Sequence, residues 1–181
     1  RVRNVFFEVC ADLYSQAFYG TIREHVHGYG HKFIGHMNVE GELHWGVRQQ
    51  FDYFRNAQLM DWGGVDSLFR MTWKRDGFFT DNATGAKLAA SAAKLYGLER
   101  VMSENFGGAG WGFAPRHARW ILGFLAACGV NYWIPHAYYY SIESYRKTEW
   151  PPSHGRHSLF ARNAAHVNDY AARLNVCMSG G

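Results

Sequence analysis

Residues 84–111 read TGAKLAASAAKLYGLERVMSENFGGAGW, and this stretch decides the fold. Its first part, residues 84–96, is rich in Ala, Leu and Lys and therefore predicts an α-helix, which Gly97 ends. Residues 100–103 then form a short run that predicts a β-strand, and Glu104 follows that strand directly. A helix that leads into a strand is the repeating unit of an α/β fold.

The same unit of helix and strand recurs about four times at a spacing of roughly 30 residues. Apolar residues at helical periodicity predict further helices at residues 2–27, 45–60, 115–128 and 158–174. Short apolar runs predict strands at residues 31–36, 64–68 and 130–135, and residues 175–178 would begin one more. Alternation of this kind implies parallel strands that are connected by helices.

Two architectures fit this alternation: a doubly wound sheet and a TIM-type (β/α)8 barrel. No G-x-G-x-x-G or Walker-type loop follows a predicted strand, which argues against a nucleotide-binding sheet. Polar and aromatic loops follow the strands instead, at residues 36–40, 104–108 and 136–140. A barrel builds its active site from polar side chains at successive strand ends.

The chain has 181 residues, whereas a complete barrel needs about 250. We therefore expect an α/β fold that is a partial (β/α)8 barrel of about four βα units. On this interpretation residues 1–181 are the C-terminal part of a catalytic barrel domain and a fragment of a longer chain. In that longer chain an upstream signal would direct the protein to a secreted or periplasmic location.

Composition narrows the classes of partner. The formal net charge is +4, and the basic residues form no run or stripe, so nucleic-acid binding is not predicted. No apolar run reaches the ~18 residues of a membrane span. The cysteines Cys10, Cys128 and Cys177 lie far apart and in no C-x-x-C spacing, which argues against a zinc site or a disulfide framework.

The chain is rich in aromatic residues, with seven Trp, eleven Tyr and thirteen Phe. A large aromatic core would explain this richness. So would carbohydrate binding, because aromatic rings stack on the apolar faces of sugar rings, and rings also stack on nucleobases. Composition alone leaves these explanations open.

Two glutamates are candidate catalytic residues. Glu104 ends a predicted strand and precedes a glycine-rich loop, and Glu40 lies four residues after His36, with Glu42 as a competitor. Their strands are two apart, which is ~10 Å at ~4.8 Å per strand, so their carboxyl groups can approach the ~5–9.5 Å separation of glycosidases. One would protonate the leaving oxygen while the other activates water or attacks; the alternative is a structural acid paired with an arginine.

Histidines and aromatic residues near the same strand ends are candidates for substrate binding. The two histidines would bind sugar hydroxyls or tune a glutamate, or they are hydrogen-bonded core residues. The aromatic residues would form a sugar platform or only pack the loops. The candidates are His36, His136, Trp111, Tyr138, Tyr139 and Trp150.

Two other functions remain open. A half-barrel without catalysis would bind carbohydrate and pair its open strand edges with another copy or with the missing half. A metal-dependent hydrolase would use His36, Glu40 and His44, although the spacing of potential ligands alone assigns no metal site.

Three segments resemble a known family. They are residues 33–36 (FIGH) with Glu40, residues 87–111 (KLAASAAKLYGLERVMSENFGGAGW), and residues 129–141 (GVNYWIPHAYYYS) with the RK and PPS that follow. They are similar to the catalytic barrel of α-L-rhamnosidase-like glycoside hydrolases, the family numbered one hundred and six.

The resemblance covers most of the chain and carries functional implications. It implies inverting, calcium-assisted hydrolysis of terminal rhamnosides. It would make Glu40 and Glu104 the functional carboxylates, with His36 and His136 lining the sugar site. The hypothesis that Glu40 is the acid and Glu104 the base goes beyond what the resemblance implies.

Overall fold

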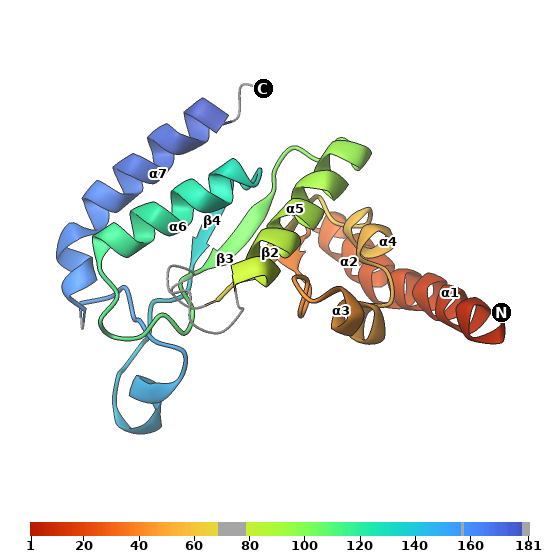
Figure 1. Cartoon of the computed structure of the whole chain (residues 1–181), viewed down its shortest axis with the longest axis horizontal. Coiled ribbons are helices and arrows are strands. Elements are labelled where there is room, and N and C mark those ends of the chain that lie inside the picture. Colours follow the sequence, from red (N-terminus) through yellow and green to blue (C-terminus); the bar gives the residue numbers. More distant parts are fainter. Residues whose placement is uncertain (69–78, 157, 179–181) are drawn as a thin grey trace.

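The computed structural model describes residues 1–68, 79–156 and 158–178. Its centre is one sheet of four parallel strands in the order β1-β2-β3-β4. The chain therefore has the α/β class expected from the sequence, and its elements follow one another across the molecule in chain order (Figure 1). The strands are β1 (Ile34–His36), β2 (Trp62–Ser67), β3 (Met102–Asn105) and β4 (Tyr132–Pro135).

Helical elements precede, connect and follow the strands. The N-terminal helix is continuous through a π-helical turn, and short 3-10 helices lie in the segment after β4. No helix in the described ranges is long and apolar enough to span a membrane. The elements are α1 (Val2–Tyr14), η1 (Ser15–Gly20), α2 (Thr21–Gly28), α3 (Leu43–Gln50), α4 (Tyr53–Ala57), α5 (Phe79–Tyr96), α6 (Pro115–Ala127), η2 (Ser144–Thr148), η3 (Leu159–Asn163) and α7 (Ala164–Met178).

One face of the sheet packs against α5 and α6 and forms the main core. Val65 of β2, together with Val101 and Val130 before β3 and β4, is buried against these helices. Gly85 allows α5 to lie close, because a Cβ there would be only 2.8 Å from Cγ2 of Val65. The helical residues of this core include Ala86, Ala89, Ala93, Ile121, Leu122 and Leu125.

The opposite face of the sheet carries the polar residues. Successive side chains of a strand alternate between the two faces, so Asp66 points away from the face that buries its neighbour Val65. Asp66 pairs in register with Glu104, and His36 pairs with Gly64, two residues before Asp66. His36, Asp66 and Glu104 therefore share the face that α5 and α6 do not cover.

The prediction of one helix over residues 45–60 is wrong. The structure has two short helices, α3 and α4, which are separated at Phe51, whose φ is +62°. Asp52 starts the second helix because its side chain accepts hydrogen bonds from the backbone N–H groups of Phe54 and Arg55.

The prediction that residues 175–178 begin another strand is also wrong, because they form the last turn of α7. Val167, Ala171 and Leu174 lie at helical spacing and pack against the core. This packing continues the helix through a segment whose local sequence is also compatible with a strand.

Ile121 should be a strong contributor to stability, because its side chain is 0% exposed in the core of α6. Ile121→Ala is expected to lower the free energy of unfolding by about 2–5 kcal/mol. Val176→Ala, which truncates a residue that is 78% exposed on α7, is the control and should change stability by less than ~0.5 kcal/mol. Urea unfolding followed by circular dichroism measures both, and equal effects would contradict this description of the core.

Candidate active site

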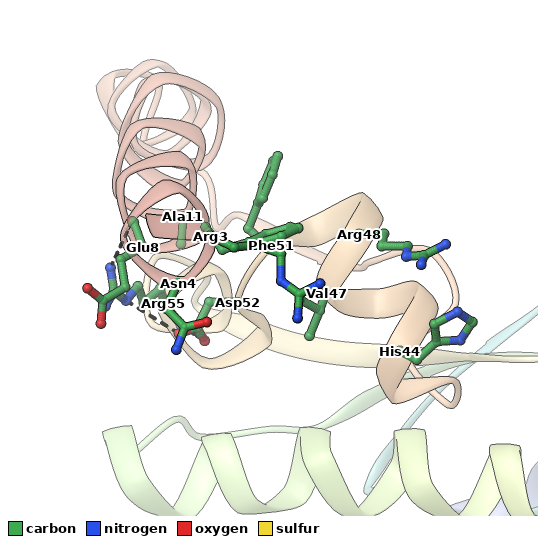
Figure 2. Close-up of a pocket in the computed structure, with 11 residues that line it drawn as sticks. Arg3, Asn4, Glu8, Ala11, His44, Val47, Arg48, Phe51, Asp52 and Arg55 are labelled. Carbon is green, nitrogen blue, oxygen red and sulfur yellow. Dashed lines mark hydrogen bonds and ion pairs between the residues drawn. The ribbon is translucent and has the colours of Figure 1, made fainter. Parts of the chain in front are cut away.

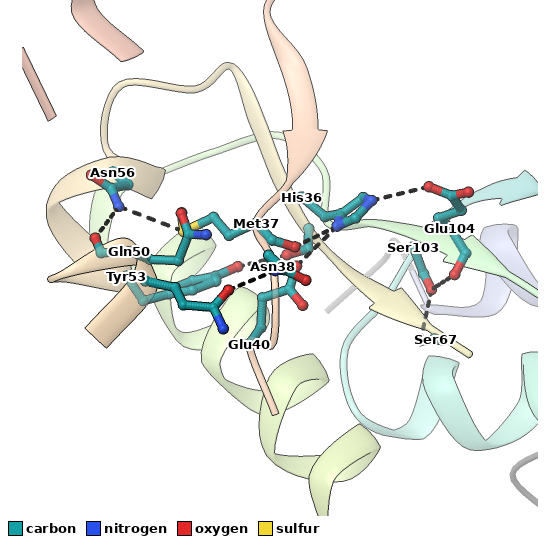
Figure 3. A network of polar contacts seen from close by, with 12 residues as sticks. His36, Met37, Asn38, Glu40, Gln50, Tyr53, Asn56, Ser67, Ser103 and Glu104 are labelled. Atoms are coloured by element: carbon teal, nitrogen blue, oxygen red, sulfur yellow. Dashed lines mark hydrogen bonds and ion pairs between the residues drawn. The ribbon is translucent and has the colours of Figure 1, made fainter. Parts of the chain in front are cut away.

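His36 connects two glutamates that are 64 residues apart in the sequence. Its Nδ1 lies 3.1 Å from Oε1 of Glu40 and 2.5 Å from the Met37 carbonyl, and its Nε2 lies 3.0 Å from Oε2 of Glu104 (Figure 3). The two ring nitrogens lie closer to each other than either of them lies to its glutamate oxygen. The carboxylate oxygens are therefore nearer to each other than the ~9.5 Å upper limit of glycosidase carboxyl pairs.

The loop after β1 brings Glu40 back under His36. Val39 adopts a φ of +54°, and the turn closes where the N–H of Glu42 donates to the Val39 carbonyl at 3.0 Å. Gly85 of α5 leaves room for this loop, because a Cβ there would be 3.3 Å from the nitrogen of Gly41 and 3.5 Å from Cβ of Glu40. Glu42 itself is exposed and forms the N-cap of α3.

The two glutamates differ in their access to solvent. The side chain of Glu40 is 2% exposed, whereas that of Glu104 is 32% exposed. Glu104 is therefore within reach of water and of a ligand above the sheet. Glu40 lies beneath His36 and is reached through the cavity described next.

A cavity of about 270 Å³ lies between the loop after β1 and helices α3 and α4. Tyr53 lies at its wall and donates a hydrogen bond of 2.8 Å to the Gly64 carbonyl. Burial raises the pKa of Tyr53 and of Tyr19 well above the ordinary range, and the negative charge of Glu40 acts in the same direction. Both phenols are therefore neutral neighbours of a buried carboxylate.

His36 is positively charged in this environment. Burial on its own would lower the pKa of His36, but the hydrogen bond and the charge of Glu40 oppose burial and prevail. The Met37 carbonyl and the charge of Asp66 add to that effect, and the pKa reaches about 9. The imidazolium then donates from both nitrogens, one toward each glutamate.

Asp66 is a third acidic residue of the site, and the sequence analysis missed it. Its backbone is the register partner of Glu104, and its Oδ1 is buried without a hydrogen-bond partner among the described residues. Burial raises the pKa of Asp66 to about 6; the charge of His36 opposes this rise, and those of Glu104 and Glu40 add to it. The signal that pointed to Glu104, an acid near the end of a strand, was equally present in GGVDS.

The other predicted ligand-binding residues form a second cluster after β4. The N–H of His136 donates to the Asn105 carbonyl at 2.8 Å, which places His136 beside the end of β3. Its ring lies 6.2 Å from that of Tyr139, which lies 6.3 Å from Trp111. Tyr138 is largely exposed. The described contacts do not join this cluster to His36, so its part in a common site stays a prediction.

The side chains of Trp111 and Tyr139 are fixed by the loop that carries η2. Nε1 of Trp111 donates to the Lys147 carbonyl at 2.6 Å, and the hydroxyl of Tyr139 donates to the Glu149 carbonyl at 2.5 Å. Trp150 is partly exposed at the end of the same loop. These rings therefore have fixed orientations at an accessible surface.

The predicted metal trio of His36, Glu40 and His44 does not form. Within residues 1–68, 79–156 and 158–178, no three His, Cys, Asp or Glu side chains are arranged to hold a metal ion. The ring of His44 lies 4.8 Å from that of Trp45 and lines an open groove of about 640 Å³ between α1 and α3 (Figure 2). The α3 helix turns His44 toward this groove, whereas Glu40 points toward His36.

The calcium ion that the resemblance implies does not fit the acidic residues in this arrangement. A calcium ion needs six to eight oxygen ligands around one point. Glu40 and Glu104 instead direct oxygens at the two nitrogens of His36, and the imidazolium occupies the position between them that a cation would need.

The fold defines an α/β protein with a sequentially ordered parallel sheet and polar residues on one of its faces. No protein-family profile matches the chain, and no curated protein sequence matches it. Among solved structures, the chain is similar to the rhamnosidase from Novosphingobium sp. PP1Y, with a TM-score of 0.72 and 23% sequence identity. The likeness covers 94% of this chain and 16% of that one, and at this identity it shows a shared fold alone.

The charge of His36 can be measured directly. Its ring resonances in a pH titration by nuclear magnetic resonance should report a pKa of about 9. Glu40→Gln removes the charge that opposes the effect of burial, so the pKa should fall to the ordinary value of 6.5 or below it. Glu42→Gln changes an exposed neighbour and should leave the titration unchanged. A wild-type pKa near 6.5 would contradict the bridge.

The bridge should also make stability depend on pH. Because the pKa of His36 is higher in the folded chain, the imidazolium stabilises the fold fully below about pH 6.5, and this contribution is lost as the pH rises through 9. Wild type should therefore lose on the order of 2–3 kcal/mol relative to His36→Gln between pH 7 and pH 10. Asp66 titrates near 6 and contributes little in that window. Urea unfolding at each pH measures this loss. If the free energy of unfolding of the two proteins changes equally between pH 7 and pH 10, the assignment is wrong.

Proposed function

We propose that this chain is part of a glycoside hydrolase of the α-L-rhamnosidase-like type, with Glu40 as general acid and Glu104 as general base. The observation that carries the proposal is the convergence of the two glutamates on His36, Glu40 from the loop after β1 and Glu104 from β3. Their carboxylate oxygens lie closer together than ~9.5 Å, the upper limit for the carboxyl pairs of glycosidases. The shared fold with a rhamnosidase supports the choice of chemistry.

The proposed reaction is a single displacement. Glu104, the more exposed acid, takes a proton from water while the water oxygen attacks the anomeric carbon. The bond from that carbon to the leaving oxygen breaks, and Glu40 protonates the leaving oxygen with a proton that it takes from the His36 imidazolium. His36 therefore supplies the proton and also holds the glutamates in position, because both its nitrogens contact them.

We infer further that the sheet is part of a (β/α)8 barrel. A sequential order of parallel strands, with α5 and α6 on one face, is the arrangement found in such barrels. The outer edges of β1 and β4 have no strand partner among the described residues. Helix α1, which extends away from the sheet (Figure 1), exposes an apolar stripe of Val2, Val5, Phe6, Val9 and Leu13. The missing barrel units, or a second copy, would cover these surfaces.

The cluster after β4 would bind the carbohydrate in this proposal. Trp111 and Tyr138 present exposed aromatic rings, and His136 and Tyr139 lie beside them. Aromatic faces of this kind pack against the apolar faces of sugars. The proposal therefore places a carbohydrate along the ends of β3 and β4.

A second candidate function is carbohydrate binding without catalysis. The burial of Glu40, at 2% exposure, favours it, because a general acid must reach the glycosidic oxygen. Binding without turnover by the full-length protein would support this second function over the first.

The catalytic assignment predicts that both glutamates are indispensable. Glu40→Gln and Glu104→Gln should each lower kcat/KM on an aryl α-L-rhamnoside by at least ~100-fold, because each removes a proton-transfer group. Glu42→Gln is the matched control and should stay within twofold of wild type. The assay uses the full-length protein and a panel of aryl glycosides. Near-wild-type rates for both glutamine variants would eliminate the assignment.

A further inference from the structure

The cavity of about 270 Å³ beside Glu40 has no part in the reaction proposed above. It is enclosed by the loop after β1, by helices α3 and α4, and by Leu88 of α5. The described residues that line it include Glu40 but neither His36 nor Glu104. The cavity is therefore separate from the solvent-accessible surface at Glu104, where the proposal places the attacking water.

The walls of this cavity are mainly apolar and aromatic. Leu43 and Val47 of α3 are 61% and 47% exposed, although both side chains are apolar. A molecule in the cavity would remove part of this apolar surface from water, which is favourable. The apolar and aromatic lining residues are Leu43, Val47, Phe51, Tyr53, Phe54 and Leu88.

Two features of the backbone keep the cavity open. Phe51 has a φ of +62° and separates α3 from α4, so the two helices do not continue into one another. Gly46 of α3 has no side chain to fill the space, and a Cβ there would lie 3.6 Å from the Val39 carbonyl oxygen, an ordinary contact distance. The local fold therefore builds the space, and a side chain added at residue 46 can occupy it.

The volume of the cavity sets the size of the molecule that fits. An apolar cavity of about 150 Å³ is enough to bind benzene. The cavity beside Glu40, at about 270 Å³, therefore accommodates a molecule with one substituted aromatic ring. Rings of Phe51, Tyr53 and Phe54 line it, and aromatic rings pack favourably against one another.

The charges at the cavity decide which kind of molecule fits. Among the described residues its lining contains two carboxylates, Glu40 and Asp52, and no Lys, Arg or His, so an anion is repelled. Each carboxylate already has a cationic partner: His36 pairs with Glu40, and Arg55 lies 3.3 Å from Asp52. A cationic ligand would therefore be an uncompensated charge among apolar walls, and a sugar would leave hydroxyl groups without partners there.

We propose that this cavity binds a small neutral aromatic molecule at a site distinct from that of the sugar. The inference goes beyond the proposed function and does not depend on glycoside hydrolysis. It concerns a ligand that is held by apolar walls, whereas the proposed reaction takes place at the polar face of the sheet.

Nuclear magnetic resonance of the full-length protein can locate the ligand. Toluene should bind with a Kd of about 1 mM or tighter, and it should shift the methyl resonances of Leu43, Val47 and Leu88. The methyl resonances of Val176, which is 78% exposed on α7, should not move. Benzoate and benzylammonium carry charges and should each bind at least ~10-fold more weakly. Methyl α-L-rhamnopyranoside should not displace toluene.

Variants of the wall test the same site. Gly46→Leu should fill the cavity and weaken toluene binding by at least ~10-fold. Gly28→Leu is the matched control, because a Cβ there meets no atom within 4 Å and Gly28 does not line the cavity. Val47→Asp places a charge on a partly exposed part of the wall and should weaken binding as well, so the test does not depend on one substitution.

The contrary outcomes are equally definite. The inference is wrong if toluene shifts none of the three methyl groups, or if either charged analogue binds as tightly as toluene. It is also wrong if the sugar displaces toluene, or if folded Gly46→Leu or Val47→Asp binds toluene as Gly28→Leu does. If toluene binds as expected but no glycoside is cleaved, the hydrolase proposal fails and the assignment of the cavity stands.

Discussion

The ring of His36 holds two acidic side chains at fixed positions, and the rest of the site is arranged around it. One contact reaches Glu40 in the loop that follows its own strand, and the other reaches Glu104 on a strand two positions away in the sheet. A carboxylate as buried as Glu40 is costly to ionise without a partner. The imidazolium supplies that partner, and the same ring orients Glu104, so charge compensation and geometry have a single source.

The sheet makes this bridge possible by separating two kinds of residue. Alternation along β2 sends Val65 into the core under α5 and Asp66 to the opposite face. The register then aligns Asp66 with Glu104, and it aligns His36 with Gly64, two residues before Asp66. Packing of the core on one face fixes the strands, and it therefore also fixes the backbone positions of the polar residues on the other face.

The sequence predicted the α/β class and the four strands, since each strand is a short apolar run between helical segments. It also predicted that the strands nearest residues 40 and 104 are two apart, because strand order could be counted along the chain; Glu40 itself lies in the loop after β1. It could not predict that His36 points both nitrogens at glutamates, which depends on side-chain direction. Asp66 carries the same signal as Glu104, an acid near the end of a strand, but the GGVDS pattern does not show which face of the sheet its side chain occupies. The break at Phe51 depends on the positive φ of one residue, which an apolar period does not reveal.

Gly85 has a consequence that reaches beyond packing. Its missing side chain is what lets α5 approach Val65 on one side and the backbone of Gly41 and Cβ of Glu40 on the other. The packing of the core and the position of the acidic loop therefore both depend on the absence of a side chain at residue 85. A side chain at residue 85 would disturb the spacing of the helix and the position of the acidic loop together, so neither can be adjusted there without the other.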